Sequence, residues 1–489
     1  MTLEVLSHET SEGGLAHSAT SSITKVLELM NLGSESGSLL MDKLLQELLI
    51  EIFQFAVAAH GGRANAVTPL FLGKICRSWR AMVFETCTFW QEVTLIINPH
   101  CSTQISLLAD WTARAGSLPL SVSIIDPKGR LTAQEVLTQF LGLLRSLSPQ
   151  THSLALGTLI PFYDEWQNCG LADYSWPLLS NLSLATIKGG TELSDPASKL
   201  DFSSCPMLTT STINSFDHSY ISLPWRSLLH LHLNSVFSSE VYTALQSSPS
   251  LETMEAHGII ENNAFVGDAT SLRRPLKSLS LKLERFQFDS EQCYRIFNSL
   301  RIPELRTLEI KLAFSRSPHS SHRFDIYPCI SQSQCQLSEL SIQGASLKEQ
   351  LFLDCLRLLP SLSTLRLSNI FWLPEPPQLF QPTLFKPSSL VFILGTGPSQ
   401  PPILPNLKAL IFEESLVAFS AKFLVELLVS RWDDCGSGVE YLATLRSVRF
   451  APLELGGMWN ISEDDKAAFE RWRQRGYDIR VEGWKLYSR

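Results

Sequence analysis

The sequence has no long hydrophobic run. No apolar stretch of the chain approaches the ~20 residues that a membrane-spanning helix needs. The first residues, MTLEVLSHETSEGG, contain no basic region followed by an apolar core, so they do not resemble a secretory signal. We therefore expect no membrane partner and an intracellular protein, in the cytoplasm or the nucleus.

The ten cysteines form no CxxC pair. Cys329 and Cys335 are the closest two, followed by Cys76 and Cys87, and neither spacing matches a zinc-ligand pattern. Scattered cysteines of this kind are typical of buried thiols in a reducing compartment. We expect neither a metal nor another cofactor.

Signatures of catalysis are also missing. The chain has no G-x-S-x-G motif, no phosphate-binding glycine loop and no HExxH motif. Its net charge of −8 provides no basic field for nucleic acid. His230 and His232 could form a metal pair, but no Cys, Asp or Glu joins them at a telling spacing, and solvent-facing strand positions are the default. We expect a protein that is not an enzyme and binds no nucleic acid.

The first pattern that is present is helical and covers residues 38–97. Leucines at 44, 45, 48 and 49, followed by Ile52 and Phe53, form one apolar stripe. The stretch PLFLGKICRSWRAMVFETCTFW (69–90) predicts a second helix that starts at Pro69 and a new apolar turn at Phe89. A unit this small buries little surface by itself, so it must rest on a partner or on the remaining chain. Residues 1–37, rich in Ser, Thr, Gly and Glu, are expected to be disordered.

The second pattern is a recurring phrase between residues 98 and 460: a proline, then Leu-x-x-Leu-x-Leu or a near relative. Most copies are 18 to 34 residues apart, which brackets the leucine-rich-repeat period. Each phrase predicts a short strand with two inward leucines, and neighbouring repeats must stack to bury them. The copies are WPLLSNLSL (176–184), CPMLTTSTI (205–213), LPWRSLLHLHL (223–233), SPSLETMEA (248–256), RPLKSLSL (274–281), IPELRTLEI (302–310), QLSELSI (336–342), LPSLSTLRL (359–367), LPNLKALIF (404–412) and TLRSVRF (444–450).

The predicted fold class is therefore α/β: a small helical unit followed by an irregular leucine-rich-repeat solenoid, with short parallel strands on one face and helices on the other. Residues 374–405 hold many prolines and predict an inserted loop. Residues 461–489 predict a capped helix, a glycine stop at Gly476 and a strand, which together would cap the end of the array.

The helical unit resembles the F-box. That motif typically reads Leu-Pro-x-Glu-Leu-Leu-x-x-Ile-Phe, then Val-Cys-Arg-x-Trp-Arg, then Thr-Pro-x-Leu-Trp. The chain has KLLQELLIEIF (43–53), KICRSWR (74–80) and TCTFW (86–90), with Leu45 and Cys87 in place of the two motif prolines. The run WTARAGSLPLSVSI (111–124) is similar to the segment that follows this motif in large fungal F-box families, where a leucine-rich array often follows.

This resemblance implies an adaptor without chemistry of its own. The F-box would dock on the Skp subunit of a cullin-based (SCF-type) ubiquitin ligase, and the repeat array would hold the protein to be ubiquitylated. The residues that would divide between Skp contact and the unit's own core are Leu44, Leu48, Leu49, Ile52, Leu70, Ile75 and Trp79. Two alternatives stay open: a repeat scaffold with no ligase role, and a helical unit that only caps the array.

Alternation along the strands indicates which side chains face outward and would contact the target protein. They are His232, Ser280, Lys282, Glu309, Lys311 and Arg366. The sequence does not identify that target.

Overall fold

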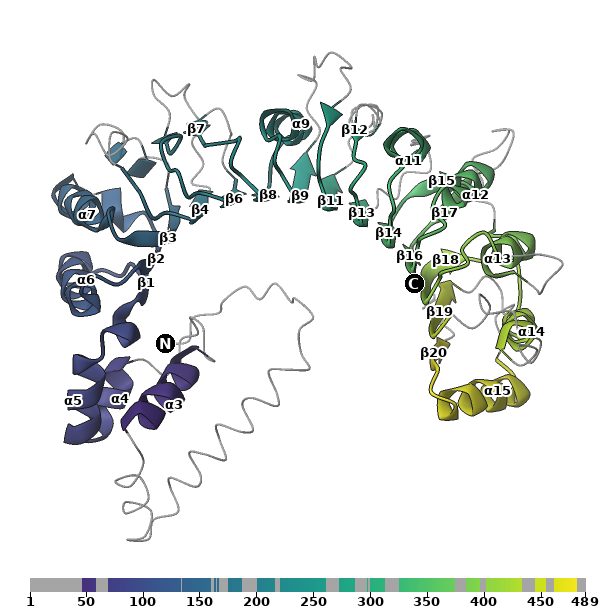
Figure 1. Cartoon of the computed structure of the whole chain (residues 1–489), viewed down its shortest axis with the longest axis horizontal. Helices are drawn as coiled ribbons and strands as arrows, with labels where there is room; N and C mark the ends of the chain where they lie inside the picture. The colour runs from purple at the N-terminus through teal and green to yellow at the C-terminus, as the bar shows by residue number, and fades with distance from the viewer. Residues whose placement is uncertain are drawn as a thin grey trace, which may run out of the picture. The chain divides into compact units, whose positions relative to one another are not determined.

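The computed structural model describes most of the chain (Figure 1). The described residues are 46–58, 69–132, 134–159, 162–163, 165–166, 175–186, 200–215, 220–260, 272–285, 297, 300–312, 325–373, 384–395, 402–432, 445–453 and 461–481. The predicted disordered segment 1–37 and Leu44 lie outside this part of the chain. The molecule divides into two compact units, Met1–Asp126 with Arg130–His152, and Pro127–Gly129 with Ser153–Arg489.

Unit 1 is mainly helical. Two of its strands, β1 and β2, pair in parallel, with Glu92 opposite Ser121 and Ile96 opposite Ile125. Gly116, with a φ of 64°, is the C-cap of α6. Its elements are α3 (Gln46–Ala58), α4 (Pro69–Ile75), α5 (Arg77–Glu85), the 3₁₀ helix η1 (Cys87–Trp90), β1 (Glu92–Ile96), α6 (Cys101–Ala115), β2 (Leu120–Ile125), η2 (Arg130–Thr132) and α7 (Gln134–Leu147).

The single helix predicted from Pro69 is wrong, because the chain breaks at Cys76 into α4 and α5. Cys76 has extended backbone (φ −151°, ψ 170°), and its Sγ accepts a hydrogen bond from the backbone N–H of Trp79. It is therefore the N-cap of α5. The break lets α4 and α5 pack against each other, and Arg80 donates to the carbonyl of Gly73 across the junction at 2.7 Å.

A cluster of aromatic side chains forms the centre of unit 1. Trp90 is buried, donates from Nε1 to the carbonyl of Val83 at 2.9 Å, and packs edge-on against Trp111. The guanidinium of Arg114 lies 4.9 Å from the ring centroid of Trp90 and 4.2 Å from that of Phe84. These contacts join α5, η1 and α6 into one core.

Unit 2 is a mixed α/β array with a long parallel sheet, compatible with a repeat solenoid. Each of the ten leucine phrases contains or leads into a strand of this sheet. In spatial order the strands are β3 (Thr151–Thr158), β4 (Asn181–Thr186), β6 (Thr210–Asn214), β8 (His230–Asn234), β9 (Thr253–Ile260), β11 (Ser278–Arg285), β13 (Thr307–Leu312), β14 (Glu339–Gln343), β16 (Thr364–Ser368), β18 (Ala409–Leu416), β19 (Ser447–Leu453) and β20 (Asp478–Val481).

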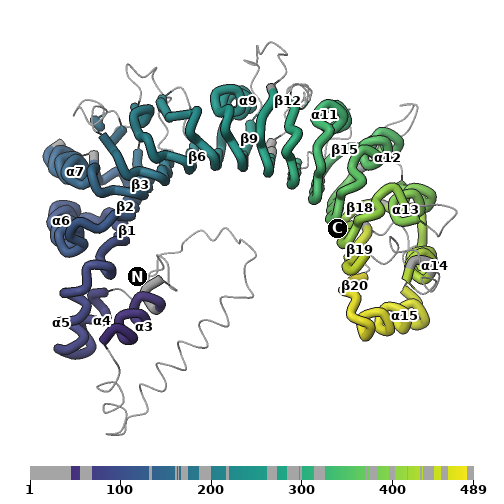
Figure 2. The backbone as a smooth tube through the Cα atoms, in the orientation of Figure 1, coloured from purple at the N-terminus to yellow at the C-terminus, as the bar shows by residue number. Residues whose placement is uncertain are grey.

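Helices and short strand pairs lie behind this sheet. In Figures 1 and 2 the strands of unit 2 follow the inner side of the chain and the helices follow the outer side. The helices are α9 (Ser238–Ser247), α11 (Tyr327–Ser333), α12 (Glu349–Arg357), α13 (Pro387–Leu394), α14 (Ala421–Trp432) and α15 (Glu463–Gln474). The short parallel pairs are β5 (Leu200–Asp201) with β7 (Ile221–Ser222), β10 (Leu272–Arg273) with β12 (Leu300–Arg301), and β15 (Ser346–Lys348) with β17 (Phe371–Leu373).

The core of unit 2 lies between the two layers. The strand leucines and isoleucines stack in register, as where Leu308, Leu340 and Leu365 occupy equivalent positions on β13, β14 and β16. All three are at most 1% exposed. No strand can bury these side chains without its neighbours, so adjacent repeats stabilise one another.

The Pro-rich stretch is not only a loop. Residues 387–394 form α13, with Pro387 in its first turn and Leu390, Ile393 and Leu394 buried. The isolated bridge between Phe385 and Val417 ties the segment to the chain after β18. The apolar run LVFIL (390–394) explains the difference, because its burial outweighs the loop tendency of the surrounding prolines. The remainder of the predicted insertion, 374–383 and 396–401, lies outside the described residues.

The last helix and strand follow the prediction for the chain end. Ser462 and Asp465 form a capping box at the start of α15, and Gly476 has a φ of 91°. β20 pairs in parallel with β19, so it adds one more strand to the sheet. No helix in the described part of the chain is long and apolar enough to cross a membrane.

Candidate functional site

Helices α3 and α4 carry an exposed apolar face. Six large hydrophobic side chains on these two helices have exposed fractions between 39% (Ile52) and 64% (Phe55). We call this set the α3–α4 face: Leu48, Ile52, Phe55, Leu70, Phe71 and Ile75. Four of the six, Leu48, Ile52, Leu70 and Ile75, are residues that the sequence singles out for partner contact.

Helical spacing produces the face. Leu48, Ile52 and Phe55 follow one another at i, i+4 and i+7, so they share one side of α3. Leu49 and Phe53 lie on the adjacent side and are buried. Phe53 packs on half-buried Trp79 with ring centroids 4.4 Å apart. Leu49 and Trp79 therefore belong to the core side of the predicted set.

Several contacts hold α3 and α4 in place. Gln54 donates to the hydroxyl of Thr88 at 2.7 Å, which joins α3 to η1. Gly73 lies so close to Phe84 that an added Cβ would sit 3.2 Å from its ring. The exposed side chains are thus displayed by helices that are packed on their other side.

A second candidate site lies in unit 2, on the outward face of four adjacent strands. His232, Glu255, Ser280 and Glu309 occupy equivalent positions on β8, β9, β11 and β13. We call them the inner row. Two residues further along, His257, Lys282 and Lys311 are opposite one another on β9, β11 and β13, and we call them the outer row. The two rows share one face because alternate strand residues point to the same side.

Hydrogen bonds connect most of these side chains. Ser280 donates to Glu309 Oε2 at 2.8 Å, and Lys311 Nζ lies 2.8 Å from Glu309 Oε1. His232 Nδ1 lies 3.2 Å from Glu255 Oε2. Lys282 has no ion pair with any described side chain, although it faces Lys311 and His257.

Burial and charge perturb two groups of the cluster. Burial by itself would raise the pKa of Glu309, but hydrogen bonds from Lys311 and Ser280 and the charges of Lys311 and Lys282 together lower it. Burial, followed by the charge of Lys282, lowers the pKa of His257. At neutral pH Glu309 is therefore ionised and His257 is neutral.

The structure brings together five of the six side chains that the sequence singles out for target contact: His232, Ser280, Lys282, Glu309 and Lys311. Arg366 occupies the equivalent position on β16, two strands beyond Glu309, and Ser341 on β14 lies between them. Sequence reasoning missed Glu255 and His257, although both follow the same alternation on β9. It also missed Phe55 and Phe71 on the α3–α4 face, where the i+7 spacing from Leu48 was the available signal for Phe55.

The two histidines that could have formed a metal pair contact different neighbours. His230 Nδ1 lies 2.8 Å from the hydroxyl of Thr253, and His232 is engaged with Glu255, so the two histidines have separate partners. Within the described ranges, no group of three or more His, Cys, Asp or Glu side chains could hold a metal ion.

No family model matches the chain, and no curated protein matches it. Among solved structures it is similar to the crystal structure of a Bacteroides fragilis protein determined as a structural-genomics target, with 13% sequence identity and a TM-score of 0.29. The match covers 57% of this chain and 66% of that chain, slightly less than two thirds of that protein's length. A likeness this weak carries no argument about fold or function.

Proposed function

We propose that the chain is the substrate receptor of an SCF-type ubiquitin ligase. In this proposal the α3–α4 region is an F-box that docks on a Skp-type adaptor and through it on a cullin. Unit 2 is a leucine-rich-repeat array whose strand face holds the target protein, in the cytoplasm or the nucleus. The observation that carries the proposal is the exposure of Leu48, Ile52, Leu70 and Ile75 on the α3–α4 face.

The physical argument is the cost of leaving this face in water. Six large apolar side chains exposed on two helices of one compact unit are typical of a surface that another protein covers. Complete burial of one aliphatic side chain contributes roughly 1.5–3 kcal/mol. A few such anchors are enough for a tight complex. The helices need no further rearrangement, because their opposite sides are already packed.

A co-purification experiment with a purified Skp-type adaptor under reducing conditions tests the proposal. Ile52→Asp should weaken binding at least about tenfold, because docking would bury an unpaired carboxylate. Ile52 is partly exposed, so the variant should keep the thermal stability of the wild type. Leu107→Asp is the matched control, since Leu107 is 57% exposed but lies on α6, and it should bind the adaptor normally.

Two outcomes would contradict the receptor proposal. Failure of the wild-type protein to capture the adaptor would favour a leucine-rich-repeat scaffold with no ligase role. Equal loss of binding in the Ile52 and Leu107 variants would show that the contact does not depend on the α3–α4 face.

A further inference from the structure

The outer row places two lysines and a histidine side by side in the middle of the strand face. Lys282 on β11 is directly opposite Lys311 on β13 and His257 on β9. Adjacent strands are about 4.8 Å apart, so the three positions span about 10 Å. Like charges directly opposite each other destabilise a sheet. Such a row needs a compensating anion.

The carboxylates of the chain itself neutralise only part of the positive charge of this row. Lys311 is paired with Glu309 on its own strand at 2.8 Å. Lys282 is half-buried and has no carboxylate partner among the described side chains. A partly desolvated ammonium group without a counter-ion is unfavourable, so Lys282 is the position at which a ligand anion would gain most.

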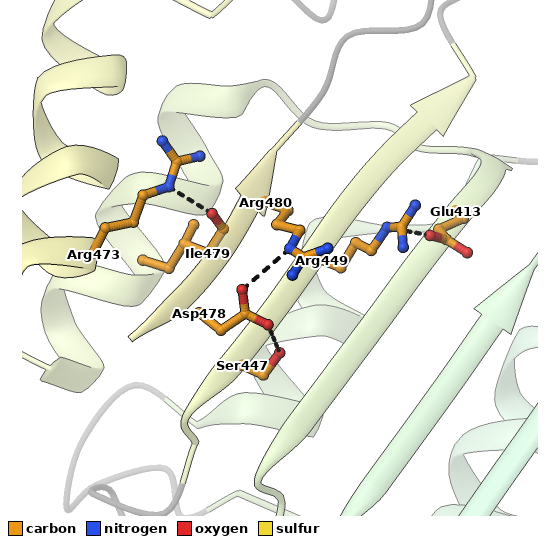
Figure 3. A network of polar contacts seen from close by, with 7 residues as sticks. All are labelled: Glu413, Ser447, Arg449, Arg473, Asp478, Ile479 and Arg480. Carbon is orange, nitrogen blue, oxygen red and sulfur yellow. Dashed lines mark hydrogen bonds and ion pairs between the residues drawn. The ribbon is translucent and has the colours of Figure 1, made fainter. Parts of the chain in front are cut away.

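At the C-terminal end of the same sheet, both members of an opposed cationic pair have a carboxylate partner. There Arg449 on β19 is opposite Arg480 on β20, which is the same kind of like-charge pairing. Glu413 lies 2.5 Å from Arg449 Nε, and Asp478 lies 3.2 Å from Arg480 Nε (Figure 3). Each arginine therefore has its own carboxylate. Figure 3 also shows Arg473, which donates from Nε to the carbonyl of Ile479 and not to either carboxylate of this pair.

We propose that the outer row binds an acidic segment of the target protein, with one Asp or Glu carboxylate placed between Lys282 and Lys311. This inference rests on the proposed role of the strand face in target binding and holds for a ligase receptor and for a scaffold alike. It adds the chemical class of the target segment. The carboxylate supplies the anion that Lys282 lacks, and the polar inner row beside it, with Ser280 and Glu309, contacts the neighbouring backbone.

The charges of the cluster favour a carboxylate over a phosphate. Glu309 is paired with Lys311 and Glu255 with His232, and His257 is neutral at pH 7 because burial and Lys282 lower its pKa. A dianionic phosphate beside Lys282 would be repelled by Glu255 on β9 and by Glu309 on β13, the two strands that neighbour β11. A single carboxylate needs only the uncompensated charge of Lys282.

Binding of the anion should also favour the protonated form of His257. The groups that face His257 are Asn234 on β8, Glu255 on its own strand, Lys282 on β11, and Glu309 and Lys311 on β13. An anion seated beside Lys282 offsets the charge that disfavours protonated His257. The pKa of His257 should therefore rise when the acidic segment binds.

Degenerate octapeptide libraries provide the test with the full-length protein and without any adaptor. Three libraries differ only at one central position, which holds Glu, Gln or phosphoserine. The Glu library should bind at least about tenfold more tightly than the Gln library, and nuclear magnetic resonance of the histidine ring protons should show an upward shift of the His257 pKa. Lys282→Gln should remove both effects, whereas Lys422→Gln, an exposed lysine on α14, should change neither.

Each result decides the inference. Equal binding of the Glu and Gln libraries, no binding of either, or a preference that survives Lys282→Gln would overturn it. Tighter binding of the phosphoserine library would replace the carboxylate with a phosphorylated target. Because adaptor capture is measured separately through Ile52, failure here leaves the ligase proposal standing, and failure there leaves the acidic-segment inference standing.

Discussion

Gly344 shows how much one backbone position can restrict the sequence. It follows β14 with a φ of 72°, and an added Cβ would overlap the carbonyl oxygen of Leu312. Left-handed backbone costs a residue with a side chain about 1–2 kcal/mol, and the overlap adds to it. We expect Gly344→Ala to lower the stability of unit 2 by at least about 2 kcal/mol, measured as a lower temperature of thermal unfolding.

Gly142 is the matched control for this substitution. It lies within α7, and no atom lies within 4 Å of its added Cβ. Gly142→Ala should therefore raise helix stability by up to about 1 kcal/mol, since alanine is the better helix former. An unchanged unfolding temperature in the Gly344 variant would show that the loop after β14 can rearrange at little cost.

The cysteines allow a second prediction at this scale. Cys76 and Cys87 are exposed, whereas Cys205 and Cys329 are buried. Burial raises the pKa of both buried thiols to about 12. At pH 8 iodoacetamide should therefore label Cys76 and Cys87 within minutes and leave Cys205 and Cys329 unmodified. Mass spectrometry of the labelled peptides checks this, and all four should react in guanidinium chloride. Rapid native labelling of Cys329 would contradict the packing around α11.

Among the elements, α15 depends on its N-terminal cap. Ser462 Oγ accepts from the N–H of Asp465 at 3.1 Å, and the Asp465 carboxylate accepts from the N–H of Ser462 at 3.0 Å. Loss of such a cap typically costs about 1 kcal/mol. Ser462→Ala should destabilise α15 by that amount, seen as faster amide exchange in its first turn. Ser106→Ala, at an exposed position of α6, should leave the stability of its own helix nearly unchanged. Equal effects of the two substitutions would show that the hydroxyl of Ser462 contributes nothing as a cap.

The elements also show what the sequence could predict. The strands followed from the leucine phrase because inward leucines at alternate positions are a local signal, and the same alternation placed His232, Lys282 and Glu309 outward. The break at Cys76 did not follow, since it depends on an extended cysteine whose sulfur caps α5. Helix α13 was not predicted, because the prolines around it favour a loop. Pairs such as β5 with β7 contain two residues per strand and have no periodicity to detect.

The candidate sites divide in the same way. Spacing along α3 identified Leu48 and Ile52, but the exposure of Phe55 depends on how α3 packs against Trp79 and Thr88, which only the folded unit fixes. Outward positions on single strands were predictable, yet their register across strands was not. The opposition of Lys282, Lys311 and His257 therefore emerges from the structure.

At the scale of the whole molecule, destabilising one strand of unit 2 should also destabilise the strands that it contacts. Leu340 on β14 stacks between Leu308 on β13 and Leu365 on β16, whereas Ile479 on β20 is paired on one side only, with Val448 on β19. Replacing a buried leucine or isoleucine by alanine costs about 2–5 kcal/mol. In an array with nearest-neighbour coupling, that loss is felt by the strands in contact.

Hydrogen exchange followed by mass spectrometry should therefore distinguish the two positions. Leu340→Ala should accelerate amide exchange in β13, β14 and β16, on both sides of the substitution. Ile479→Ala should accelerate it in β19 and β20 and leave β4 and β6 at the wild-type rate, because fraying at one end breaks only one strand contact. If both variants accelerated exchange equally in every strand, unit 2 would unfold as one cooperative body, and the stacked leucines would act over the full array instead of between neighbours.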